Sequence, residues 1–73
     1  MNLGIVYHFL EQYQQAVTFF QQSLEIKQAI GDKNGEATSL IGLGNAYNQV
    51  GRAKEGFEAL YRASQILQKL ELL

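Results

Sequence analysis

The side chains in this sequence that could do chemistry are few and widely separated. His8 is the only histidine, and the absence of cysteine rules out a thiol nucleophile and a cysteine–histidine zinc site. As a general base, His8 would need a neighbouring nucleophile and an acidic group to orient it. No serine or threonine lies in a recognisable nucleophile motif. We therefore predict no catalytic residue and interpret His8 as an exposed or groove-edge side chain.

Two other patterns are poor candidates for ligand sites. Glu55 and Glu58 are three residues apart on one helix face, but a metal site needs more oxygen ligands than this pair supplies. Gly42 and Gly44 have the spacing of part of a phosphate-binding loop, yet they lie within a helical stretch and not between a strand and a helix. These glycines are predicted to let helices pack closely. We expect no metal and no cofactor.

The composition predicts one small, helical domain. The chain has 73 residues, 47% of them hydrophobic, and it contains no proline. A net charge of −1 with scattered lysines and arginines argues against binding to nucleic acid. No apolar run approaches the roughly 18 residues of a membrane span, and the start lacks the basic region of a signal peptide. The absence of cysteine fits any compartment, so the cytoplasm is the default expectation.

Glycine-containing breaks divide the chain into four predicted antiparallel helices. Gly31 can take the left-handed conformation that ends a helix, and Asp32 or Asn34 can cap the next one. Gly51 is predicted to end the third helix as Gly31 ends the second. An earlier turn is expected at Glu11. The expected helices span residues 2–10, 13–30, the Gly31–Gly35 break to about residue 50, and about 52 to the end.

Apolar stripes predict which helix faces are buried. The helix at 13–30 carries one stripe towards its neighbours and a second one that we expect the third helix to cover. The fourth helix has one main stripe, with Tyr61 off it and exposed. The stripes consist of Tyr13, Ala16, Val17, Phe20, Leu24 and Lys27; of Phe19, Ile26 and Ile30; and of Ala53, Gly56, Phe57, Leu60, Ala63, Ser64 and Leu67.

An internal echo points to a helical repeat. Leu3-Gly4-Ile-Val-Tyr7 reappears 40 positions later as Leu43-Gly44-Asn-Ala-Tyr47. A period in this range is typical of stacked helical repeats and not of an independent globular core. The echo also predicts that Gly44 lies against the fourth helix near Gly56.

The motif Leu40-x-x-Leu43-Gly44-x-x-Tyr47, followed by Gly56-x-x-x-Leu60, resembles the tetratricopeptide repeat, which has tryptophan where Leu40 stands. The first unit matches through Leu3-Gly4-x-x-Tyr7 and Ala16-x-x-x-Phe20, although Glu11 stands where Gly51 closes the second unit. Gly31-Asp-Lys-x-Gly35-Glu-Ala is similar to the longer-period branch seen in kinesin light chains and bacterial arrays. The resemblance implies an all-α, right-handed solenoid of helical hairpins, with a truncated repeat at 1–30 and a second repeat at 31–73.

The resemblance also implies a function, that of a non-catalytic scaffold that binds a peptide or a partner helix on its concave face. In the second unit, Leu40, Leu43, Gly44 and Tyr47 face the paired helix, which leaves another face for the groove. An amide at position 45 can clamp a bound peptide backbone, because it both accepts and donates hydrogen bonds. The implied peptide-binding residues are Thr38, Ile41, Asn45, Asn48 and Gln49, with Ile5, His8 and Phe9 from the first unit.

The alternative is a structural module that assembles only with itself or within a longer array. The 40-residue offset puts an apolar stripe on the fourth helix, where no fifth helix follows. A terminal repeat normally carries a polar outer face, so this stripe predicts a homo-oligomer, most simply a two-fold dimer through the C-terminal helices. The expected self-association residues are Ala59, Ile66, Leu70 and Leu73.

Overall fold

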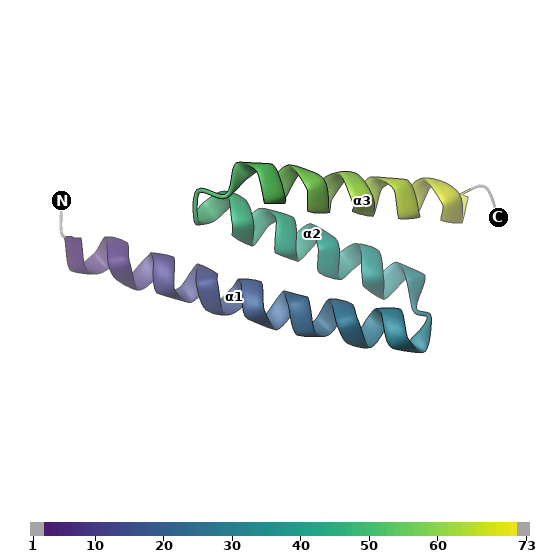
Figure 1. The fold of residues 1–73 in the computed structure, drawn as a ribbon, viewed down its shortest axis with the longest axis horizontal. Helices are drawn as coiled ribbons and strands as arrows, with labels where there is room; N and C mark the ends of the chain where they lie inside the picture. The colour runs from purple at the N-terminus through teal and green to yellow at the C-terminus, as the bar shows by residue number, and fades with distance from the viewer. Residues whose placement is uncertain (1–2, 72–73) are drawn as a thin grey trace.

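Three α-helices form the chain in a computed structural model, which describes residues 3–71 and the side chains of residues 10–71. Helix α1 spans Leu3–Ile30, α2 spans Lys33–Gln49 and α3 spans Ala53–Glu71. Each helix runs antiparallel to the one before it, and α2 lies between α1 and α3 (Figure 1). The molecule is elongated, measuring 50 × 20 × 14 Å. The all-α prediction is therefore confirmed, and no helix of the described part has the length and apolar character to cross a membrane.

The two turns form as the glycines predict. Gly31 has φ = 74° and Gly51 has φ = 83°, a region that residues with a side chain rarely adopt. Asp32 caps α2, since its Oδ1 accepts a hydrogen bond of 2.8 Å from the backbone N–H of Gly35. Its other carboxylate oxygen lies 3.6 Å from the Lys27 ammonium, which joins the cap to the end of α1. The turn is thus fixed from both helices.

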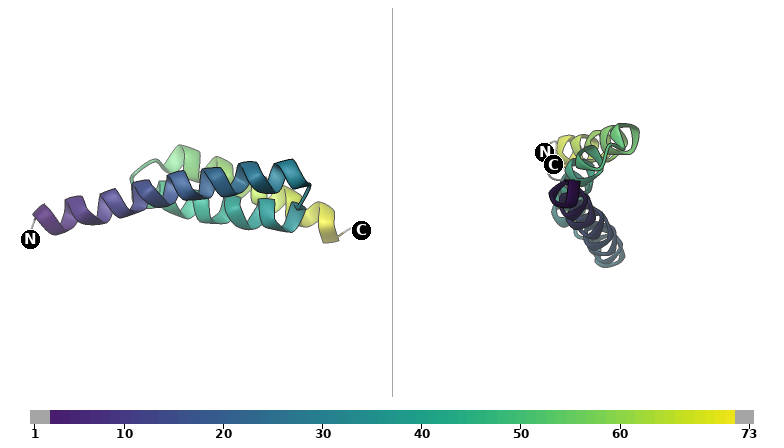
Figure 2. Two further views of the ribbon diagram at one scale, coloured as in Figure 1. Left: turned by 90° about the horizontal axis from the view of Figure 1, so that it is seen from below. Right: turned by 90° about the vertical axis from the view of Figure 1, so that its left-hand side faces the viewer.

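The predicted turn at Glu11 is absent, so the expectation of four helices is wrong for the described residues. Helix α1 continues through Glu11 and Gln12, both of which favour helix. Neither residue is a glycine that could take a positive φ, and no proline is present to interrupt the helix. The N-terminal part of α1 therefore extends beyond the ends of α2 and α3 (Figure 2).

The core is centred on α2, which is packed on both sides. Leu40 is completely buried, and Leu43 and Tyr47 are nearly so, which confirms their predicted direction. Two hydrogen bonds join α1 to α2: Gln21 Nε2 donates to the Tyr47 hydroxyl at 2.9 Å, and the hydroxyls of Ser23 and Ser39 are 2.9 Å apart. The buried apolar residues are Val17, Leu24, Ala37, Leu40, Leu43, Ala46, Tyr47, Ala59 and Ala63.

Helices α2 and α3 approach most closely where glycine faces glycine. A β-carbon on Gly44 would lie 2.9 Å from the Gly56 carbonyl oxygen and 2.7 Å from Cγ of Leu60. One on Gly56 would lie 2.9 Å from the Gly44 carbonyl oxygen. The predicted contact of Gly44 with this part of the next helix is thereby confirmed.

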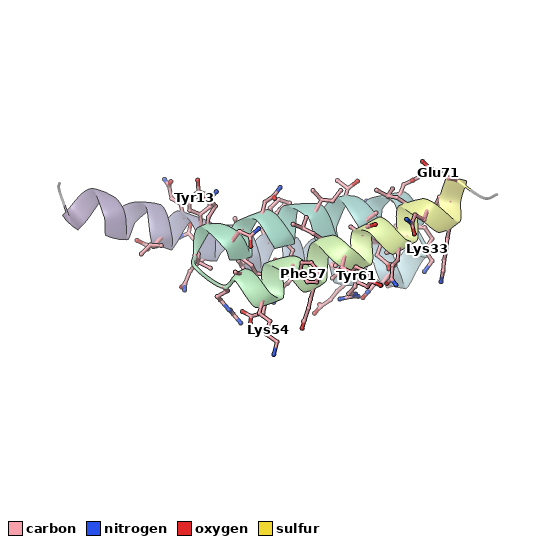
Figure 3. The ribbon with its side chains drawn as sticks, turned by 90° about the horizontal axis from the view of Figure 1, so that it is seen from above. Tyr13, Lys33, Lys54, Phe57, Tyr61 and Glu71 are labelled. Carbon is pink, nitrogen blue, oxygen red and sulfur yellow. The ribbon has the colours of Figure 1, made fainter. Side chains whose placement is uncertain are left out.

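Because of this close contact, the buried face of α3 differs from the predicted stripe. Gly56, Ala59 and Ala63 are its buried residues, because only small side chains fit beside α2. Phe57 is 69% exposed, so its assignment to the core is wrong. Tyr61 is exposed as predicted and stacks on Phe57, with ring centroids 6.1 Å apart (Figure 3).

The second stripe of α1 is also not covered as expected. Phe19 is 65%, Ile26 58% and Ile30 67% exposed, so the prediction that the next helix covers them is wrong. Helix α2 instead packs on the side of α1 that carries Val17 and Leu24. The segment before Glu11, which the predicted turn would have folded back, is part of α1 itself and cannot reach this face.

We predict that Gly44→Val lowers the free energy of unfolding by about 1–3 kcal/mol, because the added methyl groups overpack the contact with Gly56 and Leu60. Asn45→Val is the matched control, since it adds the same residue to an exposed position of the same helix and should change stability by less than about 0.5 kcal/mol. Urea denaturation followed by circular dichroism measures both. Equal effects of the two variants would contradict the close glycine contact.

Candidate functional site

The solvent face of α2 carries the residues predicted to bind a peptide. Thr38, Asn45, Asn48 and Gln49 are exposed, and Ile41 is 38% exposed, whereas the opposite side of the helix is buried. The predicted division of α2 into a packed face and an open face is therefore confirmed. No interaction with another described side chain engages the amides of Asn45 and Gln49.

A groove of about 420 Å³ runs between this face and α1. Its wall on α1 contains two aromatic rings, Tyr13 and Phe20, which are partly buried. Asn45 and Gln49 contribute polar groups from α2, while Gly42 and Ala46 leave room between the helices. The groove is lined by Tyr13, Ala16, Phe20, Gly42, Asn45, Ala46 and Gln49.

Gly42 shapes the groove by its lack of a side chain. A β-carbon at this position would collide with the ring of Phe20, so the ring packs directly against the backbone of α2. Phe19 makes an edge contact with the Phe20 ring, with centroids 5.6 Å apart and an interplanar angle of 75°. The prediction that Gly42 is a packing glycine is confirmed. Phe20 is thus part of the groove, which the sequence did not predict.

Two of the predicted residues have structural contacts of their own. The Asn48 amide lies over Gly56, where an added β-carbon would collide with Oδ1 of Asn48. Asn48 therefore marks the border of the open face with α3. The Thr38 hydroxyl donates to the backbone carbonyl of Asn34 at 3.0 Å, within its own helix. Ile41, Asn45 and Gln49 remain as the side chains that face solvent without such contacts.

The predicted first-unit residues Ile5, His8 and Phe9 lie near the start of α1, and their side chains are outside the described set. Among the described side chains, the groove is built from α2 and the middle of α1.

A second hollow of about 530 Å³ lies between α1 and α3, on the other side of α2. Leu43 and Tyr47 contribute to it from α2, and the Arg52 guanidinium lies 4.8 Å from the Tyr47 ring centroid, next to this hollow. Its charged lining consists of Glu25, Glu55, Glu58 and Arg62. The sequence could not indicate this grouping, because Glu25 is separated from the others by the whole of α2. Within residues 10–71, no cluster of three or more acidic or histidine side chains could hold a metal ion.

The predicted self-association stripe is only partly available. Ala59 is 4% exposed and packs into the core, so the expectation that it is uncovered is wrong. Ile66 is half-buried against the same core, and Leu70 is half-buried beside Lys33 and Lys69. Leu73 lies outside the described residues.

The comparison with protein families agrees with this architecture. A model of the tetratricopeptide repeat matches residues 1–70. The chain belongs to the tetratricopeptide repeat family. No curated protein and no solved structure gives a significant match. Tetratricopeptide repeats generally mediate protein–protein interaction or assembly, which is the class of function that the open face and its groove can serve.

We predict that Asn48→Leu destabilises the tetratricopeptide fold, whereas Asn45→Leu does not. Leucine at position 48 cannot reproduce the flat amide over Gly56 and should cost about 1–3 kcal/mol through overpacking. Leucine at position 45 points to solvent and gains slightly in helix propensity. Thermal unfolding of both variants checks this difference. Indistinguishable midpoints would contradict the placement of Asn48 against α3.

Proposed function

We propose that this chain is a non-catalytic scaffold that binds an extended or helical segment of a partner protein in the groove between α1 and α2. The observation that carries the proposal is the open face of α2, where Asn45 and Gln49 stand beside the aromatic wall of Tyr13 and Phe20. The bound segment would run along Ile41 and Asn45 and would end near the border formed by Asn48. Membership of the tetratricopeptide repeat family supports a role in protein interaction.

The chemistry of the groove suits a peptide backbone. An amide side chain can accept a hydrogen bond from a peptide N–H and donate one to a carbonyl at the same time. Since the Asn45 amide has no partner among the described side chains, both functions are free for a ligand. Tyr13, Phe20 and Ile41 supply apolar area for one or two side chains of the partner. Aromatic residues are enriched at protein interfaces for this reason.

We combine this function with the repeat organisation that the sequence predicts. Residues 1–30 would represent a truncated repeat and residues 31–73 a second one, arranged as part of a right-handed solenoid. In such an array the first helix of each repeat lines the concave surface, and α2 would have this position. No constellation of reactive side chains in residues 10–71 suggests catalysis.

We predict that Asn45→Ala weakens peptide binding by about two- to tenfold, the effect of losing one or two hydrogen bonds, and leaves stability unchanged. Peptides selected from a random library on the purified chain would serve as probes, with affinities measured by fluorescence anisotropy. Asn34→Ala is the control, because Asn34 is an exposed amide in the first turn of α2, away from the groove. Equal losses for both variants, or selected peptides that ignore Asn45, would contradict the proposal.

A further inference from the structure

Helix α1 carries a face that is only partly covered, whereas its counterpart on α3 is buried. The 40-residue offset aligns Ala16 with Gly56, Phe19 with Ala59, and Phe20 with Leu60. On α3 these positions pack against α2: Gly56 and Ala59 are buried, and Leu60 touches Gly44. On α1, Phe19 is 65% exposed. The face of α1 around Ala16, Phe19 and Phe20 therefore matches one that binds an α2-like helix.

The chain contains a second segment with the Leu-Gly-x-x-Tyr pattern of α2, the helix that covers this face of α3. On α2, Gly44 faces Gly56 and Leu60, while Leu43 and Tyr47 line the same hollow as Ala59. Leu3-Gly4-Ile-Val-Tyr7 repeats this part of α2. However, the segment is continuous with the helix that it would have to cover. It cannot reach that face within its own chain.

We propose that a second copy of the chain covers this face, in a two-fold dimer that exchanges the N-terminal segments of α1. The register follows from the α2–α3 pair: Gly44 faces Gly56, so Gly4 of one copy faces Ala16 of the other. Because the pairing is antiparallel, both copies make the same contact, with the two-fold axis at the level of residue 10, midway between positions 4 and 16. Such an isologous contact closes on itself and does not extend into a filament.

The exchange also explains why the N-terminal part of α1 is helical where no helix of its own chain lies beside it. These residues continue α1 beyond its packed part, and an unpacked helix end frays in water. In the dimer, residues 3–10 of each copy pack on the middle of α1 of the other. Phe19, which is exposed in the single chain, loses its contact with water in return.

The dimer completes the groove of the proposed function, and this consequence rests on that function. Ala16 and Phe20 form the α1 side of the groove that Asn45 borders. The second copy's segment would lie beside this side of the groove. The groove would then be built from two chains.

The proposed register places some exposed apolar residues of α1 inside the dimer contact and leaves equally exposed ones outside it. In this register residue 3 of the second copy lies opposite residue 17, and a side chain within one further turn, such as Phe19, still reaches the segment, as Leu60 reaches Gly44 in the α2–α3 pair. Ile26 and Ile30 are as exposed as Phe19 but lie beyond this contact. Phe19→Glu should therefore raise the dimer dissociation constant by about tenfold or more, and Ile26→Glu should leave it unchanged. Gly4→Leu should also weaken the dimer, because it adds bulk where Gly44 admits none, although it favours an isolated helix.

Sedimentation equilibrium of the full chain and these variants tests the proposal, with circular dichroism to verify that each variant is folded. We expect a dimer that Phe19→Glu and Gly4→Leu dissociate and Ile26→Glu does not. A monomer at all accessible concentrations would overturn the proposal. So would a dimer that all three variants weaken alike, which indicates non-specific association, or one that only Ile66→Glu weakens, which indicates pairing through α3.

A distance measurement tests the register directly. The chain has no cysteine, so Thr18→Cys provides a single site for a spin label on an exposed position of α1. With the axis at residue 10, two such sites are roughly 25–35 Å apart across the dimer, given the helical rise and the spacing of packed helices. A distance in this range supports the exchange, and a clearly different one overturns it. Peptide binding is measured separately, so a dimer that binds no peptide would contradict the proposed function and leave the dimer standing.

Discussion

The contact between Gly44 and Gly56 is the constraint on which the rest of this structure depends. With no side chain at either position, the backbones of α2 and α3 come close enough that each carbonyl oxygen would lie within 3 Å of a β-carbon on the other helix. Only small residues can continue such an interface, and Ala59 and Ala63 do so. The larger residues of α3 are consequently turned outward. The stacked pair of Phe57 and Tyr61 on the surface is a direct result of this rotation.

The same contact decides which part of α2 is left for binding. Helix α3 covers the side of Gly44, and α1 covers the side of Gly42 through the ring of Phe20. Leu43 and Tyr47 point to the third side, between the two outer helices. The fourth side, with Asn45 at its centre, is the one that remains open. The polar face with unpaired amides, bordered by aromatic rings, is thus left open because Gly44 and Gly42 bring α3 and α1 close to two other sides of α2.

The local features of this fold could be predicted from the sequence because they depend on neighbouring residues. Gly31 and Gly51 each end a helix with a positive φ, and the period of Leu40, Leu43 and Tyr47 identifies the buried side of α2. The phase of α3 could not be predicted, since Phe57 and Ala59 compete for the same interface and the glycine contact decides between them. The sequence did not predict that Tyr13 and Phe20 line the groove, because aromatic residues on an apolar stripe also predict burial in the core. The continuity of α1 through Glu11 was missed because a repeat pattern predicts a turn even where the residues favour helix.

Two copies of the same motif consequently have different surroundings in this chain. Leu43-Gly44-x-x-Tyr47 is enclosed by two helices. Leu3-Gly4-x-x-Tyr7 instead begins α1, whose N-terminal part extends beyond the ends of α2 and α3. In the proposed dimer, this first copy of the motif is packed by a second chain. A helix that is stabilised by burial of one face has little stability when that face is left in water.

Amide hydrogen exchange, resolved by residue and repeated across protein concentrations, measures whether residues 3–10 are packed by a second chain. We expect amides in α2 to exchange slowest at every concentration, and amides in residues 3–10 to become protected only as concentration rises. Protection of residues 3–10 that is independent of concentration would contradict the proposed dimer, as would rapid exchange of those residues at concentrations where the chain is fully associated.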